Sequence, residues 1–329
     1  MYYIIDHSTD PQWNLATEEY LFKTFKEPVF RLWRNDSSII IGLHQNAYAE
    51  INLDYVKRNN IKVVRRLSGG GAVFHDLGNV NFTFIDNQTT KEQTSEMFAR
   101  FTKPIIEALK ALGVEASLMG RNDLVIDGKK FSGNAVAVYK ERVLQHGTLL
   151  FCASMANLSE ALANRPEQFA GKSVKSNRSR VTNISEHLTK EMSVEEFIAF
   201  LEKFILDQNE GKYRLYSYTP KDLKEIARLK MEKYSKESWN YGSSPAFGYS
   251  KIKRFDWGLF ELYLEVEKGV IKDIRFYGNY FFTKETSHLE DIMRGWSINE
   301  QAIREGLKTI NLSDYFSNIT EEEFLEMFL

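Results

Sequence analysis

The stretch RRLSGGGAVFHD at 65–76 is the most informative part of the chain, because a predicted strand ends there in two arginines followed by three glycines. Side chains do not shield the backbone amides of a glycine run, so a phosphate can approach them closely. Arg66 adds a planar, charged fork that suits phosphate or carboxylate oxygens. The segment therefore predicts an anion site, with a flexible turn as the alternative. It matches neither the Walker loop nor the dinucleotide fingerprint.

A second informative stretch, GRNDLVIDGKKFSGNA at 120–135, surrounds a predicted hairpin turn. Asp127 and Gly128 are a favoured pair for a two-residue turn, in which both central residues need a positive φ. Lys130 is then placed early on the returning strand, and the small residues that follow it allow a close approach to that strand. Solvated surface is the alternative for this lysine pair.

Hydrophobic periodicity around these stretches predicts a mixed α and β chain. Ser193 and Glu196 have the spacing of a capping box, and Thr219 precedes a proline at the first helical position. We expect helices at 14–26, at 94–112 with Gly113 as the stop, at 193–207 and from 220, and strands at 28–33, 38–42, 61–66, 80–85 and 143–151.

The pattern breaks at 235–250, where SKESWNYGSSPAFGYS is rich in glycine, serine and aromatic residues. We expect a domain boundary there, with a larger domain over 1–246 and a small α+β domain over 247–329. The small domain should contain an alternating strand at 260–266, a second strand at 270–276, and two or three helices.

The composition of the 329-residue chain excludes several classes of protein. Lysine plus arginine number 43 and aspartate plus glutamate 45, a formal net charge of −2, so a dedicated nucleic-acid binder is not expected. The single cysteine excludes an intrachain disulfide and a cysteine-based zinc site, and the six histidines show no metal-ligand spacing. No signal peptide or membrane span is apparent, so we expect a cytoplasmic protein with no membrane partner.

Six motifs occur in an order that resembles the lipoate–protein ligase family. They are NLATEE at 14–19, RRLSGGGAVFHDLGN at 65–79, GRNDL at 120–124, KKFSGNA at 129–135, HGTLLF at 146–151 and SRVTNI at 179–184. The resemblance covers residues 1 to about 245, and the following small domain resembles the accessory domain of long-form ligases. It implies an α+β fold, a mixed β-sheet with flanking helices similar to biotin/lipoate ligases and class II tRNA synthetases, plus a small C-terminal α+β domain.

The resemblance also implies an activity. The family activates lipoate with ATP to lipoyl-AMP and pyrophosphate, then transfers the lipoyl group to a lysine of an acceptor domain. The implied partners are E2 subunits of 2-oxoacid dehydrogenases and the glycine cleavage H protein, and we expect a monomer. ATP and Mg²⁺ serve as substrate and activator, lipoate is a substrate, and no tightly bound cofactor is expected.

Residue by residue, the resemblance assigns Arg66 and the backbone of Gly71, Ala72, Val73 and Phe74 to ATP binding. It assigns Lys130 to contact with both ATP and lipoate, which makes Lys130 the expected catalytic residue. A positioned ammonium would offset the repulsion between the lipoate carboxylate and the α-phosphate.

Three further expectations concern residues around this site. Asp123 is the candidate Mg²⁺ ligand, since Mg²⁺ accepts few protein ligands, with a hairpin-start residue as the alternative. The basic loop at 172–180 is a candidate lid or docking patch for an acidic partner, with an ordinary solvated loop as the alternative. We expect His75 and His146 to have orienting or structural roles.

Two other functions remain open at this stage. One is a cysteine-type acyltransferase that moves octanoyl or lipoyl groups between carriers. Its cysteine is absent from SLMGRNDL at 117–124, and Cys152 should be a buried, inert thiol at a strand end. The other is a catalytically idle lipoate-binding protein. A biotin ligase is disfavoured, because no Gly-Arg-Gly-Arg-type loop stands at 68–72.

Overall fold

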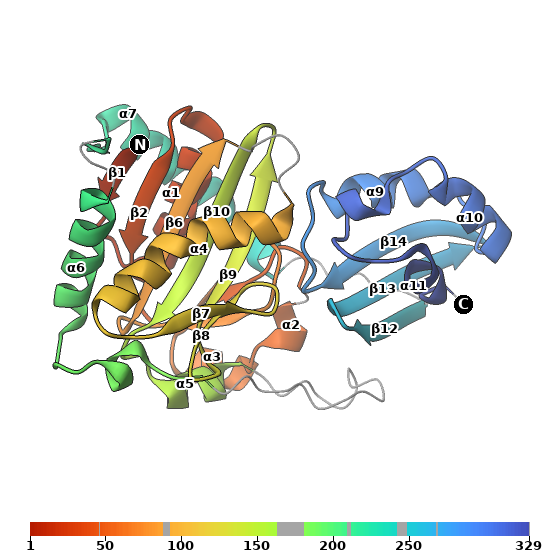
Figure 1. Ribbon diagram of the computed structural model, residues 1–329. Coiled ribbons are helices and arrows are strands. Elements are labelled where there is room, and N and C mark those ends of the chain that lie inside the picture. The colour runs from red at the N-terminus through yellow and green to blue at the C-terminus, as the bar shows by residue number, and fades with distance from the viewer. Residues whose placement is uncertain are drawn as a thin grey trace.

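The structure, a computed structural model, consists of a large body and a small one that lie side by side (Figure 1). The first described strand of the small body, which is drawn in blue, begins at residue 249. The predicted boundary at 246 and 247 lies outside the described residues and stays a prediction. The described residues are 1–45, 47–87, 93–162, 181–208, 212–241, 249–267 and 269–328.

A mixed sheet, eight-stranded within the described residues, forms the centre of the large body. Across the sheet, the order is β11 (Arg214–Leu215), β1 (Tyr2–Ile5), β2 (Val29–Trp33), β6 (Asn79–Asn87), β10 (Arg142–Leu150), β9 (Lys129–Tyr139), β8 (Asp123–Ile126) and β7 (Ala116–Met119). β1 pairs in parallel with β2 and β11, whereas the other neighbouring pairs are antiparallel. Together with its flanking helices, this sheet confirms the predicted fold class.

Helices cover both faces of the main sheet (Figure 1). Tyr3 and Phe30 pack in one core with the helices α4 (Thr94–Ala111) and α6 (Val194–Asp207). Their chain neighbours Ile4 and Val29 pack in another core with α1 (Pro11–Thr24), because successive strand residues point to opposite faces. The helix α7 (Pro220–Leu229) and the π-helical turn η3 (Lys230–Tyr234) pack against α1.

A second, three-stranded sheet positions the glycine run. β3 (Ser38–Ile41) pairs in parallel with β4 (Lys62–Arg65) and antiparallel with β5 (Val73–His75). The glycines at 69–71 connect β4 to β5, so both ends of the loop are fixed by one sheet. The large body also contains five short helical elements: α2 (Ala47–Glu50), α3 (Leu53–Arg58), α5 (Met155–Ala161), η2 (Ile184–His187) and α8 (Glu237–Asn240).

The small body has a sheet and a core of its own. β12 (Tyr249–Phe255), β13 (Gly258–Glu267) and β14 (Val270–Gly278) form an antiparallel meander. Phe260 and Phe316 are fully buried in its core. The helical elements that follow the meander are α9 (Thr286–Met293), α10 (Glu300–Leu307), η4 (Leu312–Asp314) and α11 (Glu321–Glu326). This is the small α+β unit that the sequence predicts.

The small body docks on the large one through the segment after β14. The amide of Gly278 donates to the carbonyl of His44 at 2.6 Å. The Phe281 ring belongs to the core of the large body, with its centroid 5.4 Å from that of Phe98. The His44 ring stacks on Tyr280 at 4.9 Å and meets the edge of Phe282 at 4.4 Å. The two bodies therefore share buried aromatic surface in this structure.

Local sequence signals identified most of these elements. Asp127 and Gly128 have φ values of 51° and 71°, which confirms the predicted hairpin turn. Gly113, with φ 79°, follows the end of α4, and Ser193 and Glu196 form the predicted capping box. The sequence patterns did not predict β1, and they did not predict β5, β7, β11 and β12, which lie at sheet edges where a strand carries a weaker apolar pattern.

The docked His44 predicts a stability that depends on pH. Burial, together with the nearby Arg65, lowers the pKa of His44 to about 3, whereas an unfolded histidine has a pKa of about 6.5. The contribution of neutral His44 is complete above the unfolded value and is lost as the pH falls toward the folded one. The free energy of unfolding of the wild type should therefore decrease as the pH falls from about 6 to 4. In His44→Gln the decrease should be smaller, with a difference between the two slopes of about 1.4 kcal/mol per pH unit. Urea unfolding at several pH values measures both slopes, and parallel slopes would contradict the prediction.

Candidate active site

A cavity of about 110 Å³ lies between the glycine loop and the strands β9 and β10. Gly71 and Lys130 lie toward its more exposed side, whereas Leu15 and Trp33 are almost completely buried. Lys130 lies on β9 and Trp33 on β2, with β10 and β6 between them in the sheet, so the cavity extends across these strands. Its lining residues include most of the predicted site residues, namely Arg66, Gly71, Ala72, Val73 and Lys130. Phe74 is not among them, because its ring packs in the core of the small sheet, which leaves only its backbone for the predicted ATP contact.

Arg66 shapes the glycine loop from its buried side. Its Nη2 donates to the carbonyl oxygens of Gly69 at 2.6 Å and Gly71 at 2.8 Å, and its Nε donates to Ser68 Oγ at 3.0 Å. Burial lowers the pKa of Arg66 to about 10, so the guanidinium stays charged at neutral pH. Among the described residues, no acceptor is found for the amides of Gly69, Gly70 and Gly71. Successive amides without protein partners are suited to hold an anion.

The three glycines differ in what a side chain at each position would meet. A Cβ on Gly69 would lie 2.1 Å from the carbonyl oxygen of Tyr280 in the small body. Gly70 has φ +88°, a conformation that residues with side chains rarely adopt. A Cβ on Gly71 would meet nothing within 4 Å. Gly71 is therefore the glycine with open space beside it, whereas Gly69 makes room for the small body.

Lys130 lies on β9, directly after the hairpin turn. Its Nζ forms an ion pair with Asp123 Oδ1 at 2.7 Å. A Cβ on Gly133 would come within 3.2 Å of both Cε and Nζ of Lys130, so the glycine allows the lysine to lie against its own strand. The backbone carbonyl of Lys130 accepts a hydrogen bond from the amide of Thr182 at 3.0 Å. The small residues after Lys130 predicted that some group would lie close to this strand, and that group is the side chain of Lys130 itself.

Asp123 lies at the start of β8 as the partner of Lys130. No group of three or more His, Cys, Asp or Glu side chains is placed to hold a metal ion anywhere in the described part of the chain. One carboxylate suits a Mg²⁺ ion that binds mainly through phosphate oxygens and water. Asp123 therefore fits the predicted Mg²⁺ only as the single carboxylate ligand of such an ion.

A chain of buried hydrogen bonds runs from the cavity wall away from Arg66. Ser68 Oγ lies 2.6 Å from His146 Nε2, and His146 Nδ1 lies 2.9 Å from Glu18 Oε2. Thr83 Oγ1 donates to Glu18 Oε1 at 2.5 Å. Burial alone would raise the pKa of Glu18, but its contacts with His146 and Thr83 hold it below the usual value. The chain thus gives His146 an orienting role and fixes Ser68 beside Arg66.

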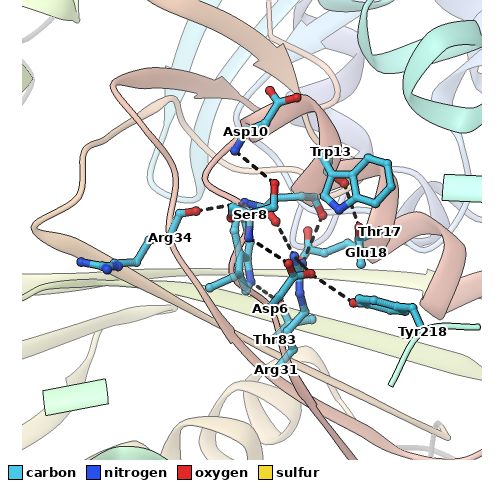
Figure 2. A network of polar contacts seen from close by, with 12 residues as sticks. Asp6, Ser8, Asp10, Trp13, Thr17, Glu18, Arg31, Arg34, Thr83 and Tyr218 are labelled. Atoms are coloured by element: carbon cyan, nitrogen blue, oxygen red, sulfur yellow. Dashed lines mark hydrogen bonds and ion pairs between the residues drawn. The ribbon is translucent and has the colours of Figure 1, made fainter. Parts of the chain in front are cut away.

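Glu18 supports the site through His146, and no sequence pattern singled it out. Its bond to His146 joins residues 128 positions apart, and no local pattern reports such a contact. Figure 2 shows Glu18 and Thr83 beside a network around Arg31, which is completely buried. Arg31 donates to Asp6 Oδ2 at 2.8 Å, so its buried charge is paired.

Comparison with protein families identifies the family to which this chain belongs. Residues 10–205 match the lipoyl protein ligase A/B catalytic domain, and residues 244–328 match the bacterial lipoate protein ligase C-terminus. The chain belongs to the lipoate–protein ligase family. It is 44% identical over 323 residues to lipoate–protein ligase LplJ of Bacillus subtilis strain 168, covering 97% of this chain and 96% of that one.

Solved structures of other lipoate ligases have the same fold. LipL1 of P. falciparum in complex with lipoate has a TM-score of 0.77 and 28% identity, over 99% of this chain and 97% of that one. Lipoate–protein ligase A bound with ATP has a TM-score of 0.64 and 30% identity, over 73% and 98%. The bipartite ligase of Thermoplasma acidophilum, described with its E2 lipoyl domain, has a TM-score of 0.65 and 31% identity, over 75% and 98%.

The environment of Cys152 differs from the expectation for this ligase. Cys152 is exposed just after β10, so the prediction of a buried thiol was wrong. β10 ends at Leu150, directly before the buried Phe151, and the chain then bends so that Cys152 is exposed. Partial burial, together with Asp76 and Glu195, raises the pKa of the thiol. A raised pKa keeps it protonated and poorly nucleophilic, which disfavours the cysteine acyltransferase. The basic loop at 172–180 lies outside the described residues.

The open space at Gly71 predicts a selective effect on nucleotide binding. A valine there should block approach to the loop amides while leaving the packing of the ligase intact. We expect Gly71→Val to weaken ATP binding by roughly tenfold to a hundredfold, the cost of losing charge-assisted hydrogen bonds, with little change in melting temperature. Calorimetry and thermal melting on the same samples measure the two quantities. Unchanged ATP affinity would show that the glycine run is only a turn and does not bind ATP.

Proposed function

We propose that this ATP-dependent lipoate–protein ligase carries out both half-reactions in the cavity between Lys130 and the glycine loop. One observation carries the proposal: a single cavity is lined by the ammonium of Lys130 and by a glycine loop whose amides have no protein acceptor among the described residues. A carboxylate and a triphosphate are both anionic, so both need donors and positive charge to meet there.

In the first half-reaction, a lipoate carboxylate oxygen attacks the α-phosphorus of ATP. The new O–P bond forms as the bond to the β-phosphate oxygen breaks, and pyrophosphate leaves. Two anions approach each other in this step, and Lys130 offsets their repulsion while the loop amides hold phosphate oxygens. When bound, Mg²⁺ neutralises charge on the pyrophosphate, and Asp123 is the residue proposed to hold it.

In the second half-reaction, the neutral amine of an acceptor lysine attacks the acyl carbon of lipoyl-AMP. A C–N bond forms, the bond from the acyl carbon to the phosphate oxygen breaks, AMP leaves, and the amine nitrogen releases a proton. The proposed acceptors are the lipoyl domains of 2-oxoacid dehydrogenase E2 subunits and the glycine cleavage H protein. The archaeal ligase described with its E2 lipoyl domain supports this class of partner.

The same proposal has the ligase acting as a monomer in the cytoplasm. Within the described residues, no helix has the length and apolar character needed to cross a membrane. The one cysteine of the chain leaves no intrachain disulfide that an oxidising compartment would have to form.

We propose that the small body supports activation. It touches the glycine loop where Tyr280 approaches Gly69, and the guanidinium of Arg121 stacks on Phe281 at 4.3 Å. Arg121 also donates to the carbonyl of Trp257 at 2.6 Å. A docked small body limits the access of water to the loop, and exclusion of water strengthens the effect of a fixed charge.

Replacement of Lys130 tests the proposed function directly. Lys130→Ala should lower the rate of pyrophosphate release by ~10²–10³, because one stabilising charge is lost from a sheltered site. Lys129→Ala is the matched control, since its side chain is the exposed neighbour on the same strand. The measurement is pyrophosphate release with ATP, Mg²⁺ and lipoate. Wild-type release from a folded Lys130→Ala protein would overturn the assignment.

A methyl group at Gly69 tests the role of the small body. Gly69→Ala places a Cβ 2.1 Å from Tyr280 O and should displace the docking segment. We expect adenylate formation to fall by about tenfold or more, while transfer from supplied lipoyl-AMP is largely kept. Transfer from supplied lipoyl-AMP by the same variant is the internal control, because it shows that the rest of the site remains folded. Equal losses in both half-reactions would argue against a role specific to activation.

A further inference from the structure

The part of the cavity beside Trp33 contains two buried donors with no protein acceptor. His75 Nε2 and Asn81 Nδ2 have no hydrogen-bond partner in the described part of the chain. The two side chains are only 3% and 1% exposed, and both residues line the cavity. Buried N–H groups without partners are rare in proteins, because each costs free energy unless something accepts its proton.

The hydrogen-bond pattern shows that both atoms are donors. Asn14 Nδ2 donates to Asn35 Oδ1 at 2.9 Å, so the amide group of Asn35 donates to His75 Nδ1 at 3.0 Å. His75 therefore carries its proton on Nε2. Burial, with Arg66 and His146 nearby, lowers the pKa of His75 to about 3 and keeps the ring neutral.

Asn81 is held in a similar way. Its Oδ1 accepts from Asn79 Nδ2 at 2.9 Å, which leaves Asn81 Nδ2 as the group without an acceptor. Asn81 lies opposite Trp33 in the pairing of β2 with β6. The Trp33 ring also meets the His75 ring edge to face at 6.2 Å. Both donors thus lie beside Trp33, and the apolar residues Leu15 and Ile40 line the same cavity.

An elongated acid can enter this cavity in one direction. Its carboxylate must lie near Lys130 and the glycine loop, because the adenylate forms there. Its far end then lies toward Trp33 on β2 and Asn81 on β6, which β10 separates from Lys130 on β9, and toward the His75 ring beside Trp33. For lipoate this far end is the dithiolane ring, whose two sulfur atoms are weak hydrogen-bond acceptors. For octanoate, which has the same number of carbons, it is a hydrocarbon without any acceptor.

We propose that His75 and Asn81 form a polar floor that recognises the dithiolane ring and makes the site favour lipoate over octanoate. This inference rests on the proposed function, since it takes the cavity as the lipoate site. Octanoate would cover both donors with hydrocarbon and leave them without acceptors, whereas the ring sulfurs give them weak ones. Sites with hydrogen-bonding groups reject analogues that lack the matching group.

The first test compares the two acids with the unmodified ligase. Pyrophosphate release at saturating ATP should give a kcat/KM for lipoate about tenfold or more above that for octanoate. This measurement needs no variant, so it holds even if replacements at the floor fail to fold. Equal values for the two acids would overturn the inference while leaving the ligase function intact.

The second test removes one donor. Asn81→Leu keeps approximate size without the amide, and should lower kcat/KM for lipoate by about tenfold while leaving octanoate unchanged or improved. Ile40→Val is the matched control, because it lines the same cavity without a polar atom and should affect both acids alike. Thermal melting confirms that each variant is folded.

The outcomes separate the inference from the function on which it rests. An unchanged ratio of the two acids in Asn81→Leu would overturn the polar floor. A higher KM for ATP with an unchanged ratio would also overturn it, because the donors would then serve the nucleotide. Failure of the unmodified ligase to activate either acid would overturn the proposed function together with the inference.

Discussion

The buried guanidinium of Arg66 is the interaction on which the site depends. It binds the carbonyls of Gly69 and Gly71 from the protein side and so determines the shape of the loop between β4 and β5. Removing this charge from water is costly, and the hydrogen bonds to carbonyl oxygens and to Ser68 offset that cost. The amides that remain without acceptors are then the part of the loop offered to an anion. An arginine of this kind acts as much through the backbone it organises as through its own charge.

The wall of the cavity includes polar residues that the packing of the sheets brings together. Glu18 on α1 and His146 on β10 form a buried pair, and Ser68 connects this pair to Arg66. Their protons all have assigned acceptors, which fixes the side chains without a ligand. His75 and Asn81 differ, because each keeps one donor unused. A satisfied chain thus supports the loop, while unsatisfied donors mark the place of a ligand.

The glycine loop also connects the two bodies of the molecule. Gly69 accommodates the carbonyl of Tyr280, and the neighbouring Phe281 ring lies in the core of the large body. A displacement of the small body therefore changes the surroundings of the loop that is proposed to hold phosphate. His44 strengthens this docking as a neutral ring between aromatic side chains, at the cost of sensitivity to acid.

The sequence by itself determined the elements that depend on a few neighbouring residues. The Asp127–Gly128 turn, the capping box at Ser193 and the stop at Gly113 follow from backbone preferences that act locally. Motif order also identified the family, and it predicted Arg66 and Lys130 as site residues, both of which line the cavity. Only the tertiary structure decided which residues meet across the fold: Glu18 with His146, Gly69 with Tyr280, and the unpaired donors of the cavity floor. Such contacts depend on how sheets and bodies pack, and no local preference of the chain encodes that packing.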